Sequence, residues 1–193
     1  MDLYDRYGHN VYRFLVHMTG SAALAEELTQ EVFVAILDSM SKGTMERFDP
    51  AKGTLEGYLL GIARNLARGE LRRNHRLLSL DGALETSEWR RLLETFDADS
   101  RTGDSLALVV AQSELRALYR AILELPVHYR EAIVLCGLGE KSYQEAAALL
   151  GVSEGTIASR MNRAKGQLAA KLRKSQSDEV GTSADRRREK DQC

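Results

Sequence analysis

The segment from Ser142 to Leu172 constrains the fold of this chain most strongly, because it contains the signals of two helices joined by a tight turn. Ser142 and Glu145 have the spacing of a capping box at the start of the first helix. Gly151 stands at the turn, where a positive φ is least costly for glycine, and Ser153 can cap the second helix. An apolar stripe at helical spacing follows, formed by Ile157, Met161, Ala164, Leu168 and Leu172. We therefore predict a helix-turn-helix.

The second helix of this segment carries charge of one sign. Residues 157–174 contain six basic side chains and no acidic one. These are Arg160, Arg163, Lys165, Lys171, Arg173 and Lys174. A basic amphipathic helix is often only a solvated surface. The capping box, the turn glycine and the second cap are more specific, and together they favour DNA binding in a major groove.

The N-terminal part of the chain has three more apolar patterns of helical spacing, over residues 3–19, 22–40 and 54–75. Ser21 and Thr54 can cap the second and third of these helices. The side chains expected to share a core are Leu3, Tyr7, Val11, Phe14, Leu15, Met18, Leu24, Leu28, Val32, Phe33, Ile36, Leu37, Leu55, Tyr58, Leu59, Ile62, Ala63 and Leu66. The outward face of the second helix is acidic and polar, with Glu26, Glu27, Gln30 and Glu31.

The third of these helices becomes basic along its length. Arg64, Arg68 and Arg72 are spaced four residues apart and therefore share one face, and Arg73 and Arg76 follow them. A solvated face explains such a stripe about as well as a nucleic-acid contact does. Its occurrence together with a basic helix-turn-helix favours two separate contacts with nucleic acid.

The remaining segments define the domain organisation. Residues 77–105 are acidic and lack lasting periodicity, which is typical of a linker. Helical spacing returns over 105–125 and 127–138, with Pro126 at the junction. The predicted fold class is all-α, with two small helical domains (1–76 and 106–174), a flexible acidic linker (77–105) and a disordered tail (175–193).

Composition excludes several classes of function. The chain of 193 residues has a net charge of -1, although residues 114–174 carry 10 basic and 6 acidic groups, a net of +4. Self-sufficient DNA-binding domains are usually more basic, so this chain is expected to need a partner to hold DNA. No catalytic motif, signal peptide or membrane span is present, and the two cysteines lack metal-ligand spacing. We expect a cytoplasmic protein that is not an enzyme and needs no metal or cofactor.

Three stretches of the chain resemble the extracytoplasmic-function class of bacterial sigma factors, the initiation subunits of RNA polymerase. They are AEELTQEVFVAI (25–36), FDPAKGTLEGYLLGIARNLARGELRR (48–73) and LPVHYREAIVL (125–135), which leads into the helix-turn-helix. Together they occur in the family's order and spacing over most of residues 3–172.

This resemblance implies specific roles for residues in the N-terminal half. Glu27, Gln30 and Glu31 would dock on the β′ clamp helices of core RNA polymerase. The loop that contains Phe48, Asp49 and Lys52 would capture an unstacked base of the −10 promoter element. The neighbouring helix would follow the phosphates and the duplex edge there through Arg64, Asn65, Arg68, Arg72 and Arg73. From the residues alone, Asn65 could equally be a buried packing amide.

For the C-terminal half, the resemblance implies recognition of the −35 element. The contacts would be Thr156, Ser159, Arg160, Arg163 and Lys165, with arginine reading guanine and lysine holding phosphate. Further partners would be the polymerase β flap and an anti-sigma factor. The chain departs from the family's usual residues at Leu24, Tyr58 and Ala158.

A stand-alone helix-turn-helix regulator is the alternative interpretation, but it leaves the segment 25–36 and the acidic linker without a role. A nucleic-acid-processing enzyme would need a metal or nucleophile cluster, and the sequence shows none.

Overall fold

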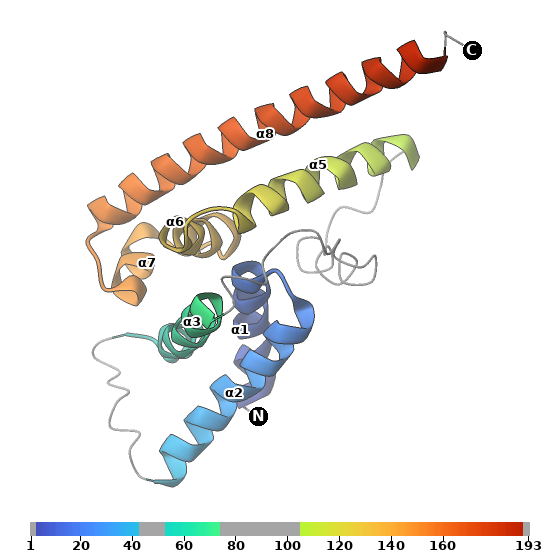
Figure 1. Cartoon of the computed structure of the whole chain (residues 1–193). Helices are drawn as coiled ribbons and strands as arrows, with labels where there is room; N and C mark the ends of the chain where they lie inside the picture. Colours follow the sequence, from blue (N-terminus) through green and yellow to red (C-terminus); the bar gives the residue numbers. More distant parts are fainter. Residues whose placement is uncertain (1–2, 43–52, 74–104, 191–193) are drawn as a thin grey trace.

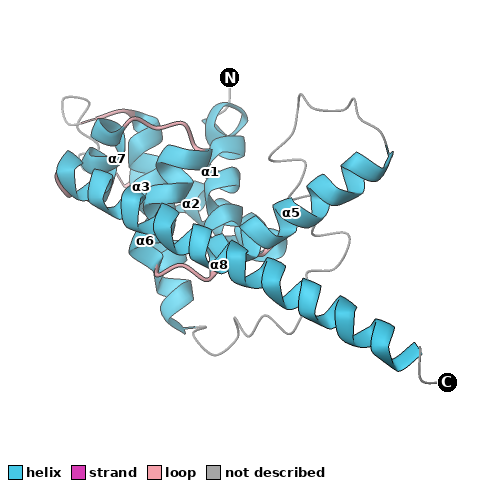
Figure 2. Ribbon diagram, turned by 90° about the horizontal axis from the view of Figure 1, so that it is seen from above, coloured by secondary structure: helices cyan, strands magenta, loops and turns pink. Residues whose placement is uncertain are grey.

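A computed structural model describes residues 3–42, 53–73 and 105–190, with the side chains of 105–112 and 175–190 left out of the description. Over these residues the structure is helical and contains no strand, which confirms the all-α prediction (Figures 1 and 2). The helices are α1 (Leu3–Thr19), α2 (Ala22–Ser41), α3 (Leu55–Arg73), α5 (Ser105–Leu123), α6 (Val127–Ala132), the π-helix η2 (Ile133–Leu138), α7 (Tyr143–Leu150) and α8 (Glu154–Lys190).

Helices α1, α2 and α3 pack against one another and form the N-terminal unit. Their predicted caps are present, because the Ser21 hydroxyl accepts the N–H of Leu24 at 3.3 Å and that of Thr54 accepts the N–H of Gly57 at 3.1 Å. Between α1 and α2, Gly20 has a φ of +76° and donates its N–H to the carbonyl of Val16. The predicted core residues of these helices are buried or partly buried, with one exception.

The exception is Leu37, which we predicted to face the core and which is 61% exposed. Ile36 is buried, so the inward face of α2 has already turned away from Leu37 at that point. The C-terminal end of α2 also extends away from the other helices (Figure 1). The placement of Leu37 in the core was therefore wrong.

Helices α5, α6, η2, α7 and α8 form the C-terminal unit, in which α5, α6 and α7 all pack against α8. The helix expected over 127–138 is divided, because its second half is the π-helix η2. Its widened turn ends with a hydrogen bond from the N–H of Gly139 to the carbonyl of Val134 at 2.8 Å. Pro126 precedes the first turn as the N-cap.

The two units share one hydrophobic core. α1 contacts α5 and η2, and α3 contacts α7. Tyr119 of α5 is fully buried and donates its hydroxyl to the carbonyl of Val16 in α1 at 2.8 Å. The Arg130 guanidinium, also buried, donates to the carbonyl of Met18 at 2.7 Å and to those of Leu123 and Leu125. It therefore satisfies carbonyls at the C-terminal ends of α1 and α5 at the same time.

The tail also differs from the prediction. We expected disorder from residue 175, but α8 continues to Lys190. The segment contains no proline, and extending an existing helix adds hydrogen bonds without the cost of a new nucleus. The predicted acidic linker lies outside the described residues up to position 104, and α5 begins at Ser105.

Candidate nucleic-acid interface

The helix-turn-helix forms as its sequence signals indicate. Ser142 accepts the N–H of Glu145 at 3.2 Å, and the Glu145 carboxylate accepts the N–H of Ser142 at 2.8 Å, which completes the capping box. The Ser142 hydroxyl also donates to this carboxylate at 2.7 Å, and that bond, followed by the one from the Ser142 N–H, lowers the pKa of Glu145. Gly151 ends α7 with a φ of +66°, and Ser153 caps α8 by accepting the N–H of Thr156 at 3.2 Å. The geometry fixes the start of α8 relative to α7.

Helix α8 buries its predicted apolar stripe and turns its polar face outward. Ile157, Met161, Ala164 and Leu168 are all buried. Three of the five predicted DNA contacts are exposed, namely Ser159, Arg163 and Lys165. Residues 159–165 of α8 therefore present hydroxyl and cationic groups at the helix surface.

The other two predicted contacts on α8 are half-buried. The Thr156 hydroxyl lies 2.9 Å from that of Ser153, so it belongs to the cap as well as to the surface. Arg160 has one terminal nitrogen, Nη1, buried without a hydrogen bond. A buried guanidinium nitrogen without a hydrogen bond costs free energy. A change of the Arg160 rotamer that brings this nitrogen to an acceptor would remove the cost. Ala158 beside it is also half-buried.

Helix α3 carries the second basic stripe, and the structure divides it into two parts. Arg72 and Arg73 are exposed, and Arg73 lies 2.7 Å from the Glu70 carboxylate. Asn65 is exposed, which excludes a packing role in this structure. Arg64 and Arg68 instead point across to the C-terminal unit, where both contact Glu131 of α6.

The sequence reasoning did not single out Glu131. Its side chain is fully buried, with Arg64 Nε at 2.8 Å and Arg68 Nε at 2.6 Å from its Oε1 atom. The available signal was an acidic residue placed directly before the apolar run 132–135, because a buried charge needs a partner.

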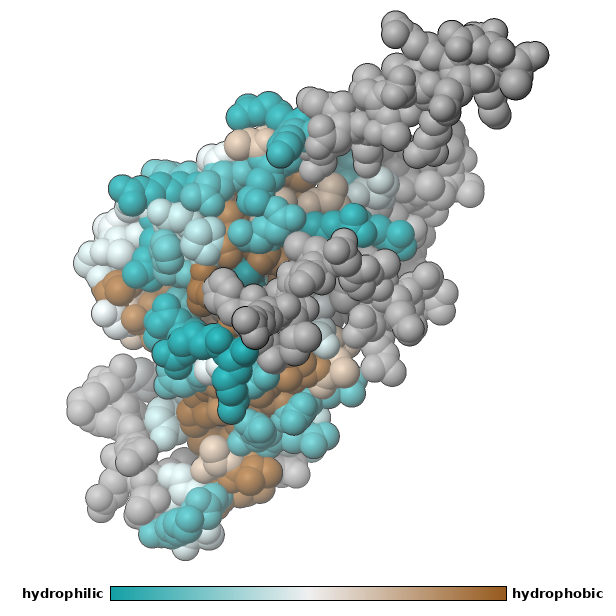
Figure 3. All heavy atoms as spheres, in the orientation of Figure 1, coloured by the Kyte–Doolittle hydropathy of each residue, from teal (hydrophilic) through white to brown (hydrophobic). Residues whose placement is uncertain are grey.

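The acidic face of α2 is exposed as predicted. Glu27, Gln30 and Glu31 all lie at the surface of the helix. The sequence reasoning missed that this face continues as an apolar surface, with Val34 64% exposed and Leu37 61% exposed. Figure 3 shows apolar surface over this part of the N-terminal unit. A mixed acidic and apolar helix face is suited to binding another protein.

The other predicted residues lie outside the described ranges or against the core. Phe48, Asp49 and Lys52 lie outside the described residues. Tyr58 and Leu24, two of the departures from the family pattern, are partly buried against the core. Within the described ranges, no group of histidine, cysteine or acidic side chains is arranged to hold a metal, and no helix there is long and apolar enough to cross a membrane.

Comparison with known proteins covers both units. Residues 3–77 match the family model described as Sigma-70 region 2, and residues 115–168 match Sigma-70, region 4. The first match contains α1 to α3. The second contains the end of α5 and the helix-turn-helix.

Among curated relatives, the chain is 32% identical to the ECF RNA polymerase sigma factor SigE of Mycolicibacterium smegmatis, over 92% of this chain and 63% of that protein. It is 32% identical to the ECF sigma factor EcfG of Rhodopseudomonas palustris, over 82% of this chain and 77% of that protein. It is 29% identical to SigM of Bacillus subtilis, over 92% and 98% of the two lengths.

A solved structure with a similar fold is the sigma factor RpoE of Bartonella quintana in complex with the anti-sigma factor NepR. Its TM-score is 0.58 at 24% identity, over 88% of this chain and 94% of that one. This similarity concerns the fold.

Proposed function

Because this chain belongs to the extracytoplasmic-function RNA polymerase sigma factors of the sigma-70 family, we propose that it binds core RNA polymerase, directs it to promoters with −35 and −10 elements, and opens the −10 region. The observation that carries the proposal is the helix-turn-helix, which presents Ser159, Arg163 and Lys165 on the first turns of α8. Its site of action would be the cytoplasm.

The C-terminal unit would read the −35 element through α8. Recognition helices contact base edges with residues near their N-terminal ends, and Ser159, Arg160 and Arg163 lie there. An arginine that donates to both O6 and N7 of a guanine favours that base over the other bases by about 1–3 kcal/mol. Lys165 is two residues further on and would hold a phosphate, which positions the protein without reading sequence.

The N-terminal unit would hold the −10 element. Arg72 and Arg73 are exposed at the end of α3, and Asn65 lies exposed on the same helix. Arg73 would exchange its exposed ion pair with Glu70 for a phosphate. Arg64 and Arg68 would join them once their contacts with Glu131 are released. Phe48, Asp49 and Lys52 would capture the unstacked base, as the resemblance implies.

The acidic face of α2 would bind the polymerase. Glu27, Gln30 and Glu31 would meet the basic β′ clamp helices, and the exposed Val34 and Leu37 would supply apolar contact beside them. The β flap would bind the C-terminal unit. An anti-sigma factor is a further expected partner, since RpoE, which has the same fold, is seen in complex with NepR.

The decisive experiment is polymerase-dependent initiation. The full chain would be mixed with core RNA polymerase and a library of linear templates whose −35 and −10 regions are randomised, and run-off transcripts would be sequenced. We expect transcripts that depend on the chain and share both elements. The proposal is wrong if the chain does not bind core polymerase. Tight, sequence-specific DNA binding by the chain alone would instead favour a stand-alone regulator.

The polymerase-binding face has a matched test. Glu27→Lys and Glu31→Lys would each be compared with Glu114→Lys, which reverses an exposed acid on α5. We expect the two α2 variants to lose core affinity and the α5 variant to keep it, because only the α2 acids would face the basic clamp. Equal affinity of all three variants for core polymerase would remove the clamp assignment.

The −35 assignment is tested by comparing Arg160→Ala with Lys165→Ala on the promoters recovered from the library. We expect Arg160→Ala to change the preferred −35 sequence. Lys165→Ala should weaken all promoters to a similar extent, because phosphate contacts carry no sequence information. A uniform loss with Arg160→Ala would make Arg160 a phosphate contact.

A further inference from the structure

The contact between α3 and α6 places one buried carboxylate against two arginines of the other unit. Glu131 Oε1 lies 2.8 Å from Arg64 Nε and 2.6 Å from Arg68 Nε, and its Oε2 accepts from Arg68 Nη2 at 3.1 Å. The Glu131 side chain is fully buried, whereas those of Arg64 and Arg68 are 16% and 36% exposed. The arginines are therefore drawn from the surface of α3 toward α6.

Carboxylates and phosphates bind the guanidinium group with the same geometry, through charge-assisted hydrogen bonds to its planar edge. An arginine held by Glu131 in this way cannot offer the same nitrogens to a DNA phosphate. Among the arginines expected to contact the −10 element, Arg64 and Arg68 lie furthest from the C-terminal end of α3. Their occupation therefore removes part of the DNA surface of the N-terminal unit.

We propose that Glu131, Arg64 and Arg68 form an autoinhibitory clasp, in which a carboxylate of the C-terminal unit takes the place of DNA phosphates on the N-terminal unit of the free chain. The inference rests on the proposed function, because it assigns a regulatory state to the same −10 surface. Opening of the clasp by separation of the two units frees Arg64 and Arg68 for DNA.

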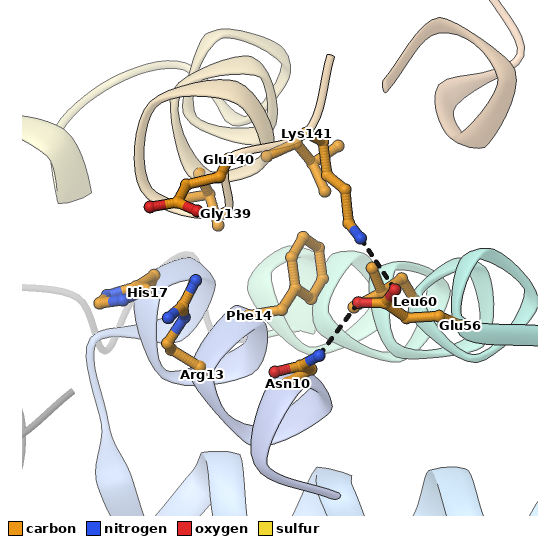
Figure 4. A pocket seen from close by; sticks show the side chains of 11 residues that line it. Asn10, Arg13, Phe14, His17, Glu56, Leu60, Gly139, Glu140 and Lys141 are labelled. Carbon is orange, nitrogen blue, oxygen red and sulfur yellow. Dashed lines mark hydrogen bonds and ion pairs between the residues drawn. The ribbon is translucent and has the colours of Figure 1, made fainter. Parts of the chain in front are cut away.

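Part of the contact between the units beside the clasp is polar. Lys141 Nζ lies 2.9 Å from the Glu56 carboxylate, and Arg13 donates to the carbonyl of Leu138 at 3.0 Å. Beside these polar contacts is a cavity of about 310 Å³, lined by residues of both units, among them Asn10, Arg13, His17, Glu56, Glu140 and Lys141 (Figure 4). Water can replace these polar contacts at low cost. Separation must also break the hydrogen bonds of Tyr119 and Arg130 to α1 and expose part of the shared core, which favours the closed state in the free chain.

The closed arrangement affects the two DNA surfaces differently. Ser159, Arg163 and Lys165 on α8 remain exposed while Arg64 and Arg68 are held. The clasp therefore leaves the −35 surface open and blocks the inner part of the −10 surface. Contact with the polymerase or with −10 DNA must open it before both surfaces are engaged.

The test uses the full chain and a fluorescein-labelled single-stranded oligo(dT) of 20 nucleotides, which probes backbone binding without needing a promoter sequence. Glu131→Gln keeps the shape of the side chain but removes the charge. The matched control is Glu124→Gln, which breaks an ion pair with Lys171 inside the C-terminal unit. Binding would be measured by fluorescence anisotropy at low salt.

We expect Glu131→Gln to bind the oligonucleotide roughly 3- to 10-fold more tightly than wild type. This is the gain when only about 10–30% of the wild-type chains are open and the variant is fully open, because only the open state binds. Glu124→Gln should bind like wild type. The triple variant Glu131→Gln with Arg64→Gln and Arg68→Gln should lose the gain, because the gain comes from the two released arginines. An affinity of Glu131→Gln equal to or below that of wild type overturns the clasp.

A second measurement follows the opening itself. Nitroxide labels at the exposed positions Ala23→Cys on α2 and Asn162→Cys on α8, in a background with Cys136→Ala and Cys193→Ala, report the distance between the units by electron–electron double resonance. We expect one dominant short distance for the wild-type sequence at residue 131 and a broader, longer distribution with Glu131→Gln. Identical distributions overturn the proposal.

Two controls keep the outcome interpretable. Circular dichroism shows whether Glu131→Gln folds. If it does not, Glu56→Gln takes its place, since it weakens the Lys141–Glu56 ion pair between the units. This variant must then bind the oligonucleotide more tightly than wild type, and an unchanged affinity overturns the clasp. Run-off transcription with core polymerase is measured separately. If the wild-type chain does not support initiation by the polymerase, the proposed function is refuted. If initiation is normal but Glu131→Gln changes neither the oligonucleotide affinity nor the distance between the labels, only the clasp is refuted.

Discussion

Replacing Arg130 with methionine should destabilise the whole fold, because this one side chain closes helix ends in both units. Its guanidinium donates to the carbonyls of Met18, Leu123 and Leu125, and the residue is only 4% exposed. Burial lowers the pKa of the guanidinium, but arginine stays charged at any pH at which proteins fold. Methionine retains much of the length and apolar contact but donates no hydrogen bond.

The expected magnitude follows from two opposing contributions. A hydrogen bond from a charged donor contributes about 1.5–3 kcal/mol, so three contribute roughly 4–9 kcal/mol. Removing the buried charge also removes its desolvation cost, which is several kcal/mol. The difference is a loss of about 2–4 kcal/mol in the free energy of unfolding. For a chain of this size, 1 kcal/mol lowers Tm by about 2–4 °C, so we expect a fall of roughly 5–15 °C.

Urea unfolding followed by circular dichroism measures this loss, with Arg120→Met as the control, since Arg120 is an exposed arginine of α5. The control should lie within about 0.5 kcal/mol of wild type. A loss below about 1 kcal/mol for Arg130→Met would show that water or other donors replace the guanidinium. The reasoning about shared helix ends would then be wrong.

Four further predictions concern α1, α5 and two turns. Burial, with a smaller contribution from Arg13, lowers the pKa of His17 from 6.5 to about 4. The unfolded chain therefore takes up a proton at this residue before the folded chain does, so the free energy of unfolding is highest above pH 6.5 and falls as pH falls toward 4. We expect about 2 kcal/mol less stability at pH 5 than at pH 7 from this group, and His17→Gln should flatten that pH dependence in urea titrations. Gly151→Ala should cost about 1–2 kcal/mol from its positive φ alone, because no atom lies near the added Cβ to clash with it. Gly20→Ala should cost more than Gly151→Ala in the same assay, because its Cβ would also meet Leu123 Cδ1 at 2.6 Å. Tyr119→Phe should cost only about 1 kcal/mol in thermal unfolding, because the Val16 carbonyl keeps its bond from the N–H of Gly20.

Local signals made much of the fold predictable from the sequence. Ser142, Glu145, Gly151 and Ser153 act within a few residues of themselves, so capping box, turn and second cap are all present where they were expected. Leu37 failed because the inward face of a helix depends on where its neighbours end. That information is absent from the apolar pattern of α2 alone.

The candidate site was predictable only in part. Exposure of Arg163, Lys165 and Glu31 follows from helical periodicity, and the structure has all three at the surface. The pairing of Arg64 with Glu131 joins residues 67 positions apart, and no local pattern specifies such a contact. Arginine stripes look the same in a sequence whether they face solvent, DNA or a carboxylate.

The contacts between the units also differ in how freely their residues can be exchanged during evolution. Tyr119, Arg130 and Arg13 donate to backbone carbonyls of the opposite unit, and a carbonyl is present whatever side chain its residue carries. Each of these three residues can therefore be conserved while the residue that supplies its carbonyl is replaced by others. The carboxylate of Glu131 instead requires a cation on α3, so in an alignment of descendants of this chain position 131 should change only together with positions 64 and 68.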